Sequence, residues 1–162
     1  MHKRSMTAVA ALAIAAVTLT SVAAAGPGAA KQRVAINMKN LPNGTFVFTP
    51  LQAGALKPDT GTTSHAVANY VPRVVVREGQ DVSIYKPVVW VLTGKRGNLT
   101  IREPANEWVD TGDAAIGIGR WKVVRGTGQY AQVAGGGRSA HVGHKGGTGP
   151  WFARQEGFLT LP

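Results

Sequence analysis

One stretch decides the fold: Trp121-Lys122-Val123-Val124-Arg125-Gly126-Thr127-Gly128-Gln129-Tyr130-Ala131-Gln132-Val133-Ala134-Gly135-Gly136-Gly137-Arg138. It starts as an alternating strand, turns at a Gly-X-Gly corner with a short Tyr/Val-anchored turn, and reopens into an extended run after three consecutive glycines. Glycine adopts positive φ at low cost and lets two backbones approach closely. The stretch therefore predicts a sheet that bends tightly on itself.

Short strands continue on both sides of this stretch. Residues 45–49, 82–85, 88–93 and 99–102 alternate or are rich in β-branched and aromatic side chains, with turn residues between them. No window beyond the first 25 residues has apolar residues at helical spacing. We predict an all-β domain, a small antiparallel β-barrel of about eight strands, with a β-sandwich as the alternative. The 21 glycines favour the barrel, because closure needs bends at the strand corners.

Two connections are predicted from turn residues. Residues 93–98, Thr-Gly-Lys-Arg-Gly-Asn, have the composition of a hairpin turn. Residues 103–113 contain a proline and are expected to form a loop that carries Trp108. The acids of that segment, Glu103, Glu107, Asp110 and Asp113, are then expected to be solvated.

The first 25 residues have the order of a secretory signal peptide. A basic head that includes Lys3 and Arg4 precedes an apolar run and the small residues Ser21-Val22-Ala23-Ala24-Ala25. We predict an N-terminal signal helix at 1–25, cleavage after Ala25, and a single secreted domain at 26–162 with no stable membrane insertion after cleavage. An uncleaved anchor is the alternative.

Cysteine content and charge narrow the class further. There is no cysteine, which excludes disulfides, thiolate chemistry and lipoprotein acylation, and favours a bacterial exported protein. The formal charge is +10, or +8 without Lys3 and Arg4. A net positive charge attracts anionic partners in a salt-dependent way. We expect an anionic cell-envelope polymer rather than a specific nucleic-acid site.

The tract from Gly119 to Gly137, preceded by Leu92 to Thr100, resembles exported actinobacterial proteins of unknown function. It is also similar to the superfamily of eight-stranded barrels that includes dirigent proteins and allene oxide cyclases, in which Gly-Thr-Gly, one aromatic-anchored turn and Gly-X-Gly form a barrel corner. The resemblance covers about a third of the chain, roughly residues 88–142. It implies a barrel with a cavity along its axis, but no catalytic residue of either family matches a position here.

Common catalytic and metal-binding patterns are incomplete. His141 and His144 fall on opposite faces of a strand and lack a third ligand, so we predict no metal and no cofactor. The glycine runs at 126–128 and 146–149 precede no helix and lack the Lys-Ser/Thr of a phosphate loop. Ser139 and His141 share a face but are too close in sequence for the hydrogen bond of a catalytic pair.

Cations and tryptophans gather in the second half of the chain and supply the candidate site. Arginine and aromatic side chains together can hold anionic groups and stack on rings. We predict ligand-binding residues at the barrel rim, namely Arg102, Trp108, Arg120, Arg125 and Arg138, whereas Trp121 is expected to be buried.

Three functions follow as hypotheses. The first is a secreted, non-catalytic barrel that binds a small ligand or an anionic envelope polymer. The second is a dirigent- or cyclase-like protein, an isomerase if it is an enzyme, that acts on a small apolar substrate in the barrel. The third is a structural or interaction protein, and the sequence leaves oligomerisation open.

Overall fold

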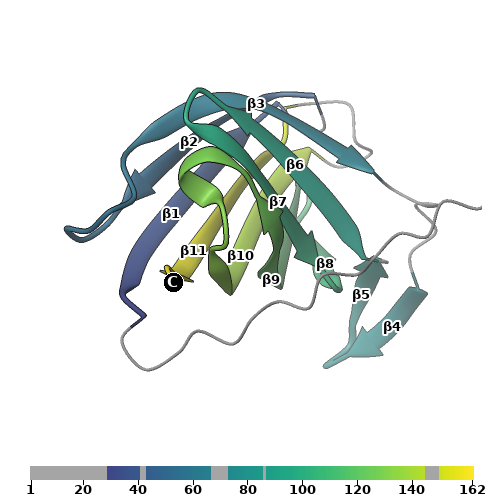
Figure 1. The fold of residues 1–162 in the computed structure, drawn as a ribbon. Helices are drawn as coiled ribbons and strands as arrows, with labels where there is room; N and C mark the ends of the chain where they lie inside the picture. Colours follow the sequence, from purple (N-terminus) through teal and green to yellow (C-terminus); the bar gives the residue numbers. More distant parts are fainter. Residues whose placement is uncertain (1–28, 41–42, 67–72, 86, 145–149) are drawn as a thin grey trace, which may run out of the picture.

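The structure is a computed structural model that describes residues 29–40, 43–66, 73–85, 87–144 and 150–162. The predicted signal peptide and its cleavage point after Ala25 lie outside these residues. The described chain is all-β (Figure 1). Its strands are β1 (Lys31–Lys39), β2 (Thr45–Pro50), β3 (Asp59–Ala66), β4 (Arg73–Arg77), β5 (Gln80–Tyr85), β6 (Val88–Gly94), β7 (Gly97–Glu103), β8 (Asn106–Asp110), β9 (Ala114–Gly126), β10 (Ala134–His144) and β11 (Phe152–Thr160), and a 3-10 turn, η1 (Gly128–Tyr130), joins β9 to β10.

Eight of these strands close into an antiparallel barrel. Hydrogen-bonded neighbours follow the order β10, β11, β1, β2, β3, β6, β7, β9, and the pairing of β9 with β10 completes the circle. The predicted barrel of about eight strands is therefore confirmed, and the sandwich is excluded. Closure satisfies the backbone donors and acceptors that an open sheet would leave at its edges.

The other three strands extend the sheet from one end of the barrel. The 13-residue β9 pairs with β7 through its second half and with β8 through its first half. β8 then pairs with β5, and β5 with β4. Figure 1 shows β4 and β5 projecting from the barrel beside β8. We call this end the β8 end and the opposite end, where η1 lies, the η1 end.

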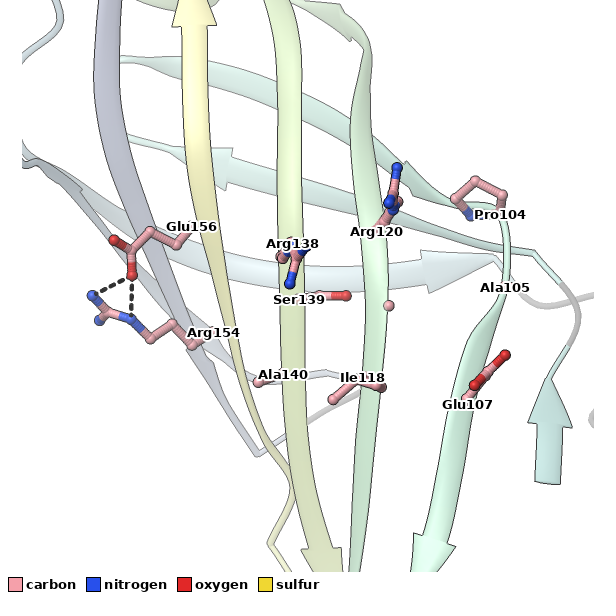
Figure 2. A pocket seen from close by; sticks show the side chains of 11 residues that line it. Pro104, Ala105, Glu107, Ile118, Arg120, Arg138, Ser139, Ala140, Arg154 and Glu156 are labelled. Carbon is pink, nitrogen blue, oxygen red and sulfur yellow. Dashed lines mark hydrogen bonds and ion pairs between the residues drawn. The ribbon is translucent and has the colours of Figure 1, made fainter. Parts of the chain in front are cut away.

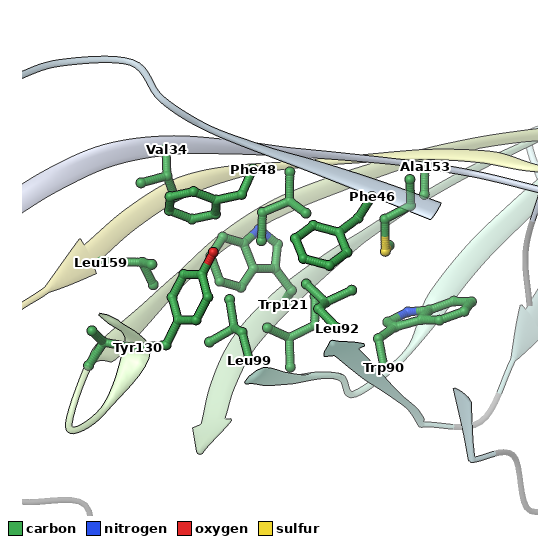
Figure 3. Close-up of a cluster of buried hydrophobic side chains, with 14 of the residues drawn as sticks. Val34, Phe46, Phe48, Trp90, Leu92, Leu99, Trp121, Tyr130, Ala153 and Leu159 are labelled. Atoms are coloured by element: carbon green, nitrogen blue, oxygen red, sulfur yellow. The ribbon is translucent and has the colours of Figure 1, made fainter. Parts of the chain in front are cut away.

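Apolar side chains fill the barrel between the two ends (Figure 3). Alternation along each strand aims every second residue inward, as in Val34 and Ile36 of β1 or Leu99 and Ile101 of β7. Trp121 is 3% exposed, which confirms its predicted burial. Its indole Nε1 donates to the carbonyl of Arg138, 3.1 Å away, across the β9–β10 pair.

The Gly-X-Gly corner forms the η1 end as the sequence predicts. Tyr130 of η1 is fully buried, and its hydroxyl donates to Asp59 Oδ2 at 3.1 Å. The same Asp59 carboxylate accepts the backbone N–H groups of Lys95 and Arg96, which form the predicted 93–98 hairpin turn. One buried carboxylate thus ties β3, the β6–β7 turn and η1 together.

The predicted loop at 103–113 is wrong. Glu103 is the last residue of β7, and Asn106–Asp110 form β8, so within this segment only Pro104 and Ala105 and the β8–β9 connection at 111–113 lie outside strands. β7 and β8 both pair with β9, and a proline is tolerated at such a break because no ladder hydrogen bond is required of it. Glu103 is consequently an interior residue with 0% exposure rather than a solvated loop acid.

Candidate functional site

Three of the five predicted site residues lie together on the outer surface. Arg120 of β9 stands directly opposite Arg138 of β10, and Arg102 of β7 stands opposite Lys122 of β9. All four side chains are exposed. Among the described residues none of the four has an acidic partner. We call Arg102, Arg120, Lys122 and Arg138 the outer basic face.

A groove of about 720 Å³ runs beside this face (Figure 2). Pro104, Ala105, Ile118, Arg120, Arg138 and Arg154 contribute to its lining. Its two acids already have cationic partners. Glu107 accepts from Arg77 at 2.7 Å, and Glu156 accepts from Arg33 and Arg154. The hydrogen bond from Arg33 lowers the pKa of Glu156, which holds that carboxylate ionised. Glu156 is also the cross-strand partner of Arg138, but its ion pairs are with Arg33 and Arg154, which lie outside the outer basic face.

Of the other two predicted residues, Trp108 does not join this face, and Arg125 lies on the same side of the sheet, farther along β9. Trp108 is half-buried on the inner face of β8, opposite Gly117 of β9. Arg125 is exposed near the end of β9, beyond a bulge at which the register with β7 shifts between Thr100 and Ile101. The bulge places an extra residue in β9, so Arg125 does not share the inner face of Trp121 and Val123 that strict alternation along the strand would give it.

A buried polar cluster lies inside the barrel at the β8 end. The Glu103 carboxylate accepts hydrogen bonds from Trp90 Nε1 at 3.1 Å, from Asn106 Nδ2 at 2.8 Å and from Gln155 Nε2 at 2.8 Å. His141 Nε2 lies 3.2 Å from Glu103 Oε1. The four polar residues Glu103, Asn106, His141 and Gln155 are at most 4% exposed. We call them, together with the buried Ser139, the Glu103 cluster.

The cluster keeps Glu103 ionised. Burial raises the pKa of Glu103, because it penalises the charged form. Hydrogen bonding and Coulombic attraction to His141, with the hydrogen bonds from Asn106 and Gln155, outweigh burial and lower the pKa to about 2. The carboxylate is thus a fixed, buried negative charge that His141, Asn106 and Gln155 stabilise.

Aromatic rings pack against the cluster at the β8 end. Trp108 packs on the His141 ring with centroids 5.4 Å apart, and on Trp151 in an edge-to-face contact at 4.9 Å. The rings of Tyr85 and Trp108 also make an edge-to-face contact, with their centroids 6.0 Å apart. Tyr85, Trp108 and Trp151 are each only partly buried. We call these three residues the aromatic rim.

Sequence reasoning missed the Glu103 cluster, although one signal for it was present. Leu99 and Ile101 alternate with polar residues, and continuing that alternation by one step turns Glu103 inward. The pairing of Ser139 and His141 on one face was predicted correctly and is confirmed by their burial. Gln155 carries no such signal, because its role depends on β11 lying beside β10.

The described residues contain no group of three or more His, Cys, Asp or Glu side chains placed to hold a metal ion. In the same part of the chain, the search for a helix of sufficient length and hydropathy to cross a bilayer finds none. No family model, curated protein or solved structure matches the chain.

Proposed function

We propose that this is an exported bacterial protein that binds an anionic cell-envelope polymer through the outer basic face. One observation carries the proposal: two like-charged cross-strand pairs, Arg120–Arg138 and Arg102–Lys122, lie side by side on β7, β9 and β10. Like charges directly opposite each other destabilise a sheet. A phosphate- or carboxylate-bearing chain laid across the strands would relieve that repulsion at both pairs.

The surroundings of the face fit an extended anion. The adjoining groove adds Arg154, and the whole chain has a formal charge of +10. Arginine binds phosphate and carboxylate groups with two parallel N–H donors, which favours it over lysine for such contacts. Exposed Phe158 of β11 neighbours Gly136, the residue that faces Lys122, and offers an apolar surface beside the cations.

Export is the second half of the proposal. It relies on the basic head, the apolar run and the small residues that end at Ala25. N-terminal sequencing of the protein recovered from culture medium should begin at Gly26. Recovery of the intact chain only from the cell interior would remove both export and an envelope partner.

The resemblance to dirigent proteins and allene oxide cyclases supports a second candidate, a protein that acts on a small apolar substrate in the barrel. Apolar side chains, among them Val34 and Tyr130, fill the barrel interior. This candidate is therefore weaker than surface binding. The Glu103 cluster is the one interior feature that favours it.

Binding is tested with immobilised teichoic acid, a carboxylated polysaccharide and uncharged dextran. We expect retention on the anionic polymers at about 50 mM salt, loss of retention at about 500 mM, and no retention on dextran. Arg120→Gln with Arg138→Gln should weaken binding and reduce the slope of log affinity against log salt by roughly two, one for each cation removed.

The matched control is Lys39→Gln with Lys95→Gln, which removes the same charge from exposed positions on β1 and the β6–β7 turn. If the two double variants lost the same amount of affinity, binding would depend on net charge alone. That result would overturn the assignment to this face. Indifference of the wild type to both anionic polymers would overturn the function itself. Tighter retention on duplex DNA than on either polymer would replace the envelope polymer with nucleic acid.

A further inference from the structure

The Glu103 cluster contains more hydrogen-bonding atoms than it uses. A carboxylate only accepts, so the NH₂ ends of Asn106 and Gln155 face Glu103 and their carbonyl oxygens face away from it. Asn106 Oδ1, Gln155 Oε1 and Ser139 Oγ have no hydrogen-bond partner, and their residues are at most 4% exposed. Buried polar atoms without partners are costly and uncommon in folded proteins.

Two of these oxygens converge on one point. Asn106 and Ser139 are the cross-strand partners of Gly119 on either side of β9. A Cβ atom on Gly119 would lie 2.1 Å from Asn106 Oδ1 and 2.9 Å from Ser139 Oγ. The missing side chain of Gly119 therefore lets two acceptor oxygens face the same small space inside the barrel. Ser139 can also donate, whereas Asn106 Oδ1 can only accept.

The two tryptophans of the aromatic rim, Trp108 and Trp151, lie beside the cluster through the contact of Trp108 with His141. The indoles of Trp108 and Trp151 cover Gly117 and Gly143, where a Cβ would come within 2.5 Å of each ring. Within the described chain neither indole N–H makes a hydrogen bond, whereas those of Trp90 and Trp121 both do. The rim tryptophans can therefore change position without breaking a hydrogen bond, unlike the two core tryptophans.

We propose that the β8 end of the barrel binds a small molecule that presents a hydrogen-bond donor, a hydroxyl or an ammonium, on an apolar or aromatic frame. Asn106 and Ser139 receive the donor, and Trp108 and Trp151 move apart and stack on the frame. Acceptors in a desolvated site select strongly for the donor, because an analogue without it leaves them unpaired. The tryptophan faces also favour an ammonium through their π-electrons. The side chains of this site are buried, whereas those of the outer basic face are exposed, and Gly119 and Ser139 also border the groove beside that face.

The four tryptophans supply a direct measurement. In ¹⁵N-labelled protein, the indole N–H resonances would be followed during titration with benzyl alcohol, benzylammonium and benzyl methyl ether. We expect benzyl alcohol or benzylammonium to shift the signals of Trp90, Trp108 and Trp151, with Trp121 unchanged. The ether, which has no donor, should bind at least about tenfold more weakly. The stronger of the first two probes identifies the kind of donor.

Ser139→Ala tests the recognition group without removing a hydrogen bond of the fold, since Ser139 Oγ has no partner. It should leave the melting temperature unchanged and weaken binding of the donor probe by about tenfold, which a lost hydrogen bond in a buried site produces. Ser64→Ala, at an exposed position of β3, is the matched control and should bind like the wild type. The proposal is overturned if no probe shifts the rim signals, if the ether binds as well as the alcohol and the ammonium, or if Trp121 shifts along with the others.

Discussion

Glu103 shows how one residue can depend on four strands. Its partners come from β6, β8, β10 and β11, so its charge is stabilised only when the barrel is closed. Removing one member of a buried, hydrogen-bonded charge pair leaves the rest without compensation. We expect Glu103→Gln to lower the free energy of unfolding by about 3 to 5 kcal/mol at pH 7, measured by urea denaturation. Glu156→Gln, which breaks exposed ion pairs, should change it far less.

The same carboxylate predicts how stability depends on acid. Its folded-state pKa of about 2 lies below the unfolded value of 4.5, so the unfolded chain takes up the proton first as the pH falls. The stabilisation is therefore complete above about pH 5 and is lost between there and pH 2, by roughly 3 kcal/mol in total. Urea denaturation of wild type and Glu103→Gln at several pH values should show the two converging over this range. A constant difference down to pH 2 would contradict the assignment.

Tyr130 and Asp59 make a second buried contact that can be measured. Burial raises the pKa of Tyr130, so its hydroxyl remains a donor to Asp59 throughout the neutral range. Tyr130→Phe should cost about 1 to 2 kcal/mol of unfolding free energy, because Asp59 Oδ2 loses a donor in a buried site. A double-mutant cycle with Asp59→Asn should give a coupling energy above about 0.5 kcal/mol. Strict additivity of the two substitutions would show that the contact contributes nothing.

At the scale of elements, glycines let β10 and β11 lie close together over Trp121. Gly137 and Gly157 are direct partners, and a Cβ on either would lie within 2.2 Å of a backbone oxygen across the pair. We expect Gly157→Ala to destabilise the barrel by several kcal/mol in urea denaturation, since strand backbones rather than side chains must move. Gly112→Asn is the control. Nothing lies within 4 Å there, and asparagine tolerates its positive φ of 84° better than most residues do.

The three strands outside the barrel should be less stable than the eight within it. Among the strands that the structure describes, β4 pairs only with β5, and Val74 and Val76 are 56% and 70% exposed. Local opening is easiest where few apolar contacts are lost. Hydrogen exchange followed by mass spectrometry should show the amides of β4 and β5 exchanging well before those of β1 and β11. Equal protection in both groups would mean that the extension unfolds only together with the barrel.

At the scale of the whole molecule, the sequence alone predicts the barrel but not the Glu103 cluster inside it. Alternation and the glycine corner depend on local geometry, so the Trp121–Arg138 stretch predicted the curvature correctly. The loop predicted at 103–113 is wrong, because a single sequence does not show that β7 and β8 share β9 as a partner. The Glu103 cluster joins residues up to 52 positions apart, from Glu103 to Gln155, and only the closing order of the strands brings them together.

The order in which the strands pair around the barrel also predicts where the chain can be cut. β1 and β11 are neighbours, with Lys31 opposite Thr160 and the Leu161 N–H bonded to the Ala30 carbonyl at 3.0 Å. A circular permutant of residues 29–162 can join Pro162 to Ala29 through a short glycine linker. If the chain is opened between Gly112 and Asp113, every strand stays intact. We expect it to melt cooperatively, within about 2 kcal/mol of its parent, because the exposed β8–β9 connection bears few contacts. Opening between Gly136 and Gly137 instead divides β10, on which the β9–β10 closure depends, and should abolish the cooperative melt followed by circular dichroism. If both permutants melted alike, closure by β10 would not be what holds the barrel together.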